Sequence, residues 1–182
     1  MSAETVVAVF GSSATQPASE EWMDAERVGA RLAEAGHTVV TGGYGGVMEA
    51  VSRGAVSTGG HAIGVTAPDL FAARPGANSY VTDERPAATL TDRIGALIGL
   101  ASGVIVLPGS IGTAAELVVA WNLNHVRRNN GGPRLPTVAV GSGWREMWNL
   151  MTGRMGAFAE DVHVVGTAAE AVEWLLAQPE IR

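Results

Sequence analysis

The most constraining feature of this 182-residue sequence is a regular alternation of short apolar runs with longer amphipathic segments. The apolar runs are rich in valine and bounded by glycine, which is typical of buried strands. The longer segments carry apolar residues at the spacing of one helix face. Strands that alternate with helices in this way form a parallel sheet. We therefore predict an α/β fold: a doubly wound parallel sheet with helices on both faces.

The boundaries of the elements follow from the same pattern. Strands are expected at residues 5–10, 37–41, 61–66, 80–82, 103–107, 137–140 and 162–165. Helices are expected at residues 19–35, 46–57, 89–101, 114–126, 144–155 and 168–177. The composition of residues 67–79 and 127–136 predicts loops, the second of them exposed and mobile. No linker interrupts the pattern, so we expect one domain over residues 1–182.

Charge and hydrophobicity exclude several classes of function. Eighteen acidic and twelve basic residues give a formal net charge of −6. Nucleic acids and anionic membranes are bound by clustered positive charge, which this composition does not favour. No apolar stretch reaches the roughly 20 residues of a membrane-spanning helix, and the N-terminus does not resemble a signal peptide. We expect a cytoplasmic protein that binds neither nucleic acid nor membrane.

The sequence contains no cysteine, and all twelve of its basic residues are arginine. Without cysteine there are no disulfides and no thiolate metal sites, and the four scattered histidines lack the spacing of metal ligands. Without lysine there is no P-loop lysine and no Schiff base. Chemistry must therefore rest on carboxylates, arginine, hydroxyls, backbone groups or histidine, and we expect neither a metal nor a cofactor.

In a parallel sheet, ligands bind at the carboxyl ends of the strands, near the point where the strand order reverses. Three loops that follow predicted strands are rich in glycine, serine and threonine. The first, GSSAT at residues 11–15, offers backbone amides and hydroxyls to an anion, with Gly11 and Ser12 as candidate contacts. An ordinary turn between strand and helix explains these residues equally well.

The second loop, TGGYGGVME at residues 41–49, has four glycines within five positions. Glycine loses more conformational entropy on folding than other residues, so this composition favours positive φ angles or backbone that lies against a ligand. We interpret the segment as a binding loop, with Gly43, Gly45 and Met48 as candidates. Glu49 falls in the first turn of the next helix, where any carboxylate is favourable, so its role stays open.

The third loop is LPGSIGTAAE, residues 107–116. Three small residues would expose backbone N–H groups at a helix N-terminus, where phosphate binds readily: Gly109, Ser110 and Gly112. Thr113 and Glu116 also have the spacing of a capping box, in which both side chains serve only to close the helix end. A cap does not need the neighbouring glycines. Glu116 is therefore either a cap or a chemical group.

Together these loops resemble those of the LOG (Lonely Guy) family, the cytokinin riboside 5′-monophosphate phosphoribohydrolases, which are often labelled lysine decarboxylases. The family motif P-G-G-x-G-T-x-x-E matches residues 108–116 at every position except Ser110. A G-G-x-x-G-x-M-like segment matches residues 42–48, and VFGSS at residues 9–13 is similar to the family's first phosphate-side loop. The resemblance covers nearly the whole chain and implies a Rossmann-like nucleotide-binding fold.

The resemblance also implies an activity. The family hydrolyses the N-glycosidic bond of a nucleoside 5′-monophosphate, here AMP or an N6-substituted AMP, to free base and ribose 5-phosphate. By position, the catalytic pair would be Arg93 and Glu116, with Arg93 holding Glu116 ionised. Thr113 and the motif backbone would bind the phosphate. Family members are commonly homodimers or larger homo-oligomers, so we expect this chain to associate with itself.

Other classes of protein compete with this interpretation. A non-catalytic nucleotide-binding sensor or carrier would use the same three loops, and the sequence barely separates it from an enzyme. A dinucleotide oxidoreductase is disfavoured because no G-x-G-x-x-G fingerprint occurs. A pyridoxal-dependent decarboxylase is excluded because the chain has no lysine. We therefore predict a phosphoribohydrolase, with the carrier as the alternative.

Overall fold

The computed structural model describes residues 5–73, 76–155 and 159–181. Its strands are β1 (Val6–Phe10), β2 (Thr38–Thr41), β3 (Ala62–Thr66), β4 (Asp83–Pro86), β5 (Gly103–Val106), β6 (Thr137–Val140) and β7 (His163–Val165). Its helices are α1 (Glu20–Glu34), α2 (Val47–Ser57), α3 (Leu90–Leu100), α4 (Ile111–Asn129), α5 (Ser142–Met155) and α6 (Ala168–Leu176), with a short 3-10 helix η1 (Ala159–Asp161). No helix in these described ranges combines the length and hydrophobicity needed to cross a membrane.

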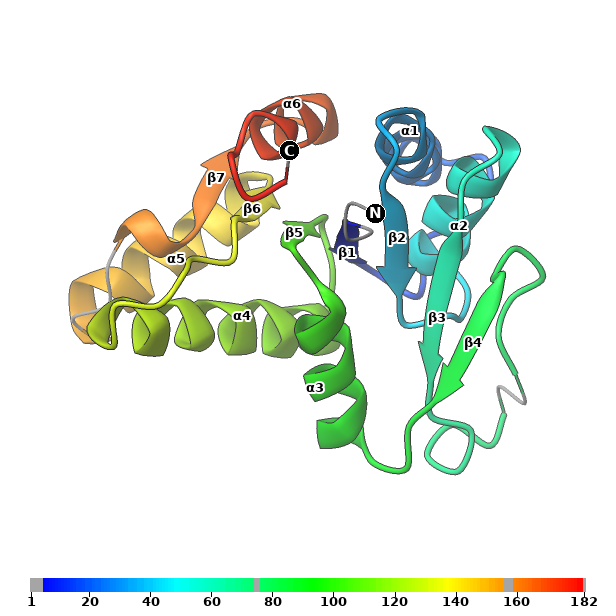
Figure 1. Ribbon diagram of the computed structural model, residues 1–182, viewed down its shortest axis with the longest axis horizontal. Coiled ribbons are helices and arrows are strands. Elements are labelled where there is room, and N and C mark those ends of the chain that lie inside the picture. Colours follow the sequence, from blue (N-terminus) through cyan, green and yellow to red (C-terminus); the bar gives the residue numbers. More distant parts are fainter. Residues whose placement is uncertain (1–4, 74–75, 156–158, 182) are drawn as a thin grey trace.

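The seven strands form one parallel sheet in the order β4-β3-β2-β1-β5-β6-β7 (Figure 1). Alternate residues of β1 point to opposite faces, as the period of a strand requires. Val7 and Val9 join a core with α1, α2 and α6, whereas Ala8 and Phe10 join a core with α3, α4 and α5. This confirms the predicted doubly wound α/β fold.

The order of the strands reverses at β1, which lies between β2 and β5. The loops that leave β1, β2 and β5 are joined at this point by backbone hydrogen bonds. Ser12 N donates to Pro108 O at 3.1 Å, and Val47 N donates to Ser12 O at 2.9 Å. The three glycine-rich loops of the sequence therefore meet at one edge of the sheet.

One predicted strand is wrong. Residues 80–82 precede the strand, and β4 is formed by Asp83–Pro86 instead, paired with β3 through Ile63 and Asp83. All four residues of β4 are exposed. Such a strand lies at the sheet edge, where charged residues and proline are tolerated, so it shows no apolar pattern for sequence analysis to detect.

Helix α4 is longer at both ends than the predicted 114–126. It begins at Ile111, so Thr113 is not its N-cap, and it continues to Asn129 into the segment predicted as a loop. Arg127 and Arg128 stand in its last turn, where positive charge is favourable. Arg128 also donates to Asp161 and Glu160 at 2.7 and 2.9 Å, which ties this end of the helix to η1.

Candidate active site

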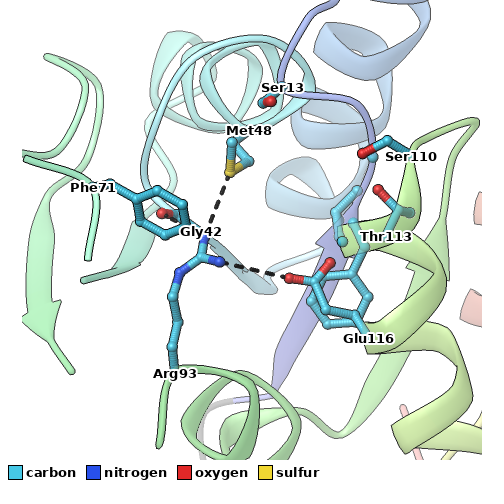
Figure 2. A pocket seen from close by; sticks show the side chains of 12 residues that line it. Ser13, Gly42, Met48, Phe71, Arg93, Ser110, Thr113 and Glu116 are labelled. Atoms are coloured by element: carbon cyan, nitrogen blue, oxygen red, sulfur yellow. Dashed lines mark hydrogen bonds and ion pairs between the residues drawn. The ribbon is translucent and has the colours of Figure 1, made fainter. Parts of the chain in front are cut away.

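A pocket of about 190 Å³ opens at the carboxyl ends of β1, β2, β3 and β5, where the strand order reverses. Its wall comes from five segments that are far apart in the sequence, and Figure 2 shows residues of each. The lining residues are Val9, Phe10, Gly11, Ser13, Gly42, Met48, Phe71, Arg93, Ser110, Gly112, Thr113 and Glu116. The topology has thus brought most of the predicted site residues to one place.

The N-terminus of α4 forms the polar end of the pocket. Ser110 is the N-cap, in an extended conformation with φ −105° and ψ −164°, so its side chain is accommodated without a left-handed backbone. The first intrahelical bond runs from Ala114 N to Ser110 O at 2.9 Å. The amides of residues 111–113 precede that bond and are available to an anion, beside the hydroxyls of Ser110 and Thr113.

The capping box that the spacing of Thr113 and Glu116 allowed is not formed. Thr113 is the third residue of α4, buried in the helix, and its side chain packs against the backbone of Gly109, where a Cβ would overlap it. Glu116 therefore lies in the second turn, too far along the helix to cap it. Of the two interpretations of Glu116, the cap is eliminated.

The carboxyl group of Glu116 lies in the floor of the pocket. The residue is 9 % exposed. Within the described part of the chain its one polar contact is with Arg93, whose Nη1 lies 3.9 Å from Oε1. Burial raises the pKa of Glu116 to about 7, and the Arg93 charge offsets only part of that rise. The expected effect of Arg93, which favours the ionised form of Glu116, is present, but burial outweighs it. The carboxyl instead titrates near neutral pH, which suits proton transfer.

Arg93 is a fixed positive charge and not a surface ion pair, because the residue is only 7 % exposed. Its Nε donates to Val65 O at 2.8 Å and its Nη2 to Gly42 O at 3.0 Å, at the ends of β3 and β2. The Met48 thioether lies 3.9 Å from Nη2. These contacts hold the guanidinium in one orientation and leave Nη1 directed at Glu116, as Figure 2 shows.

Two glycines of residues 41–46, Gly42 and Gly46, serve the protein's own packing. A Cβ at Gly42 would occupy the position of Arg93 Nη2, so only glycine admits the guanidinium there. Gly46 has a φ of 68° and lies against the backbone of Ser12 and Ser13. The close backbone approach that the sequence indicated is therefore real, but the approaching group at these two positions is protein.

Some predicted binding residues do not line the pocket. Gly43, Gly45 and Gly109 are not among the lining residues, and Ser12 is committed to the backbone bonds that join the loops. Glu49 stands in the first turn of α2 and is also absent from the lining. Ser12 and Gly109 thus support the pocket, the first by joining its loops and the second by making room for Thr113.

Sequence reasoning missed Phe71, which lies in the loop after β3 and lines the pocket. The only signal was an aromatic residue within an otherwise Pro-, Gly- and Ala-rich loop. It also passed over Ser13, which lines the pocket beside Gly11. No cluster of three or more acidic or histidine side chains suited to a metal ion occurs in the described ranges.

Relatives of known sequence match about half of the chain. A pyrimidine/purine nucleotide 5′-monophosphate nucleosidase from Escherichia coli K12 is 36% identical over 107 residues. That match covers 54% of this chain but only 23% of the nucleosidase. An uncharacterized protein from Archaeoglobus fulgidus is 31% identical over 105 residues, covering 56% of this chain and 64% of its own length.

Solved structures resemble the whole chain. The molybdenum cofactor (Moco) binding protein of Rippkaea orientalis has a TM-score of 0.74 and 19% identity, with 96% of each chain covered. A Moco carrier protein from Chlamydomonas reinhardtii has a TM-score of 0.69 and 26% identity, covering 96% of this chain and 99% of its own. The first of these likenesses concerns the fold alone.

A family model, that of the SLOG cluster4 family, matches residues 4–126. The matched range runs from β1 into α4 and includes every residue that lines the pocket. It covers well over half of the chain, and it agrees with the LOG-like motifs at residues 42–48 and 108–116. The chain belongs to the SLOG cluster4 family.

Proposed function

We propose that this chain hydrolyses the N-glycosidic bond of a nucleoside 5′-monophosphate to free base and ribose 5-phosphate. One observation carries the proposal. Glu116, whose pKa is raised to about 7, lies beside a fixed arginine and one helical turn beyond an anion-accepting helix N-terminus. The similarity to the E. coli nucleosidase, 36% over 107 residues, supports this choice of substrate.

The 5′-phosphate would bind at the start of α4. Backbone N–H groups of residues 111–113 and the hydroxyls of Ser110 and Thr113 surround that position. Charged acceptors form the stronger hydrogen bonds with such donors. Thr113 and Glu116 are three residues apart and share one face of the helix, so the ribose attached to the phosphate would lie over Glu116.

The chemistry needs one carboxylate and one water molecule. When the bond between C1′ and the base nitrogen breaks, its electron pair leaves with the base and positive charge develops on the ribose. Ionised Glu116 stabilises that charge and accepts a proton from the water whose oxygen bonds to C1′. That proton returns through solvent to the nitrogen of the departing base, so the base leaves neutral, the ribose gains the hydroxyl of the water and Glu116 is ionised again. Arg93 keeps part of the Glu116 population ionised at neutral pH.

A second candidate is a nucleotide-binding carrier without catalysis. The Chlamydomonas carrier, 26% identical over 96% of this chain, favours it. So does the absence, among the described residues, of a hydrogen bond that would orient the Glu116 carboxylate. Such a protein would use the same phosphate position and the same pocket, but it would release no base.

The test is base release. Pure protein is incubated with AMP or with N6-isopentenyl AMP, and free base is separated from nucleotide by chromatography. We expect both substrates to release base, and adenosine, which lacks the phosphate, to release much less. Glu116→Gln should abolish the release from AMP. Heat protection by AMP without any release of adenine would refute the hydrolase and leave the carrier.

A further inference from the structure

Opposite Glu116, the pocket wall is apolar and is formed by Phe71 and Met48. Figure 2 shows Phe71 on one side of the Arg93 guanidinium and Glu116 and Thr113 on the other, with Met48 between Arg93 and Ser13. Phe10 also lines the pocket, but its residue is only 2 % exposed and belongs to the core beneath the sheet. Phe71, which is half-buried, is therefore the aromatic side chain that this pocket can offer to a ligand.

Phe71 is held in position by its surroundings. Leu70 N and Phe71 N both donate to Ala67 O, at 3.1 and 3.0 Å, which folds this part of the loop into a turn. Ala67 N donates in turn to the hydroxyl of buried Tyr44 at 2.8 Å. The Tyr44 ring packs edge-on against Phe71, with centroids 5.5 Å apart and planes at 72°. These contacts hold the Phe71 ring in one orientation without a ligand.

The polar side chain at this end of the pocket is Arg93, whose Nε and Nη2 donate to the carbonyls of Val65 and Gly42. The hydroxyls of Ser110 and Thr113 belong to the N-terminus of α4, at the phosphate end, and Ser13 lies beside Met48 in Figure 2. The nearby amide of Asn78 is committed to the carbonyls of Gly43 and Tyr44, and its oxygen accepts from Tyr80 N. The side chains that a base would contact at this end are the ring of Phe71 and the thioether of Met48. Both also contact Arg93, whose guanidinium carbon lies 5.7 Å from the centroid of the Phe71 ring and whose Nη2 lies 3.9 Å from the Met48 sulfur.

Resting on the proposed function, we propose that Phe71 and Met48 form the base subsite and that it binds the flat face of the base by stacking. An aromatic face and a polarisable sulfur accept any planar base, because every base has a π face. The subsite therefore takes purine and pyrimidine nucleotides alike. Purines bind more tightly because their two rings cover more of the wall.

The experiment measures binding separately from turnover. Titration calorimetry on the Glu116→Gln protein compares AMP, UMP and ribose 5-phosphate, which has no base. Phe71→Leu in the same background keeps the apolar volume but removes the aromatic face. We expect Phe71→Leu to weaken the affinity for AMP roughly tenfold or more and the affinity for UMP less. The affinity for ribose 5-phosphate should be unchanged. Leu70→Ala, in the same turn but outside the pocket lining, is the matched control and should change none of the three.

Phe71→Trp supplies a second variant that keeps a stacking face. It should bind AMP at least as tightly as Phe71 does and lose tryptophan fluorescence when AMP binds. Equal weakening of AMP and ribose 5-phosphate by Phe71→Leu would overturn the base subsite, because Phe71 would then only shape the pocket. Unchanged AMP affinity, or no nucleotide binding at all, would overturn it too.

Base release by the wild-type protein, assayed in parallel, separates this inference from the proposed function. AMP binding that depends on Phe71 without release of adenine would refute the hydrolase and retain the subsite. If adenine is released but Phe71→Leu does not change the affinity for AMP, the subsite is refuted and the hydrolase is retained.

Discussion

The same five residues, GTAAE, occur twice in this chain, at residues 112–116 and 166–170. The second copy forms a capping box at the start of α6. Thr167 Oγ1 accepts from Glu170 N at 3.2 Å, and Glu170 Oε2 accepts from Thr167 N and Gly166 N at 2.9 Å each. These bonds lower the pKa of Glu170. The first copy forms no such box, and there burial raises the pKa of Glu116 to about 7.

The difference arises before the shared residues begin. After β5 the chain continues along β1, where Leu107 N donates to Phe10 O at 2.8 Å and Pro108 O accepts from Ser12 N at 3.1 Å. Helix α4 then starts after Ser110, which places its threonine inside the first turn. Strand β7 lies at the sheet edge and α6 starts directly after Thr167. The same five residues thus form a helix cap near the edge of the sheet in one copy and part of the pocket wall at the centre of the sheet in the other.

The largest difference between the two copies is expected in catalysis. Glu116→Gln should lower kcat for AMP hydrolysis at least about 100-fold, the usual contribution of a positioned general base. Glu170→Gln removes the same group from an identical local sequence and should leave kcat within about twofold. Chromatographic assay of adenine release measures both. Comparable losses in the two variants would mean that neither carboxylate acts in the pocket.

The two carboxylates should give stability opposite dependences on pH. Glu116 binds its proton more tightly when folded, so its contribution is complete below pH 4.5 and declines by about 3 kcal/mol as the pH rises to about 7. Glu170 has a lowered pKa when folded, so its contribution is present above its unfolded pKa and is lost as the pH falls.

Urea unfolding at pH 5 and pH 8 measures this difference. Glu116→Gln should remove most of the decline and be more stable than the wild type at pH 8. Glu170→Gln should lower stability at pH 8 and leave the decline in place. A wild-type decline that persists unchanged in Glu116→Gln would contradict the raised pKa.

The glycines near the two copies should tolerate a methyl group unequally. Gly109→Ala would place a Cβ onto Thr113, close to its own Cβ, where the side chain has little freedom to move, so we expect a loss of roughly 1–3 kcal/mol in unfolding free energy. Gly166→Ala would bring a Cβ 3.3 Å from Glu170 Oε2, the flexible end of its side chain, and should cost under about 0.5 kcal/mol. Thermal melting compares them, and equal losses would contradict the packing described for Thr113.

The smallest effects, about 1 kcal/mol, are expected for the two threonines. One variant should change the stability of the protein and the other its affinity for ligand. Thr167→Val removes an N-cap and should lower the unfolding free energy by about 1 kcal/mol without altering ribose 5-phosphate binding. Thr113→Val keeps the buried shape but removes a pocket hydroxyl, so it should weaken ribose 5-phosphate roughly tenfold at little change in stability. Calorimetry that found both variants binding equally well would remove Thr113 from the phosphate position.

Much of the fold and part of the site could be predicted from the sequence. The buried strands carry their signal in consecutive apolar residues, and Arg93 and Glu116 were selected through motifs and then found 3.9 Å apart. The missed features carry no such signal. Strand β4 is polar and exposed, and Phe71 reaches the pocket because Tyr44 anchors its loop across the sheet. The sequence could not decide whether residues 113–116 form a cap, because their spacing allows one but the residue at which the helix begins depends on contacts with other elements.

By itself the sequence determined the layered parallel sheet, since apolar periodicity reports directly which residues are buried. It also determined the chemistry on offer, because a chain without lysine or cysteine must use its carboxylates, arginines and hydroxyls. Only the tertiary structure decided which GTAAE segment closes a helix and which one enters the pocket. Hydrogen bonds from β1 and the loop after it to residues 107–108 set the register of α4. The burial that raises the Glu116 pKa comes from neighbours on other elements, which no local sequence specifies.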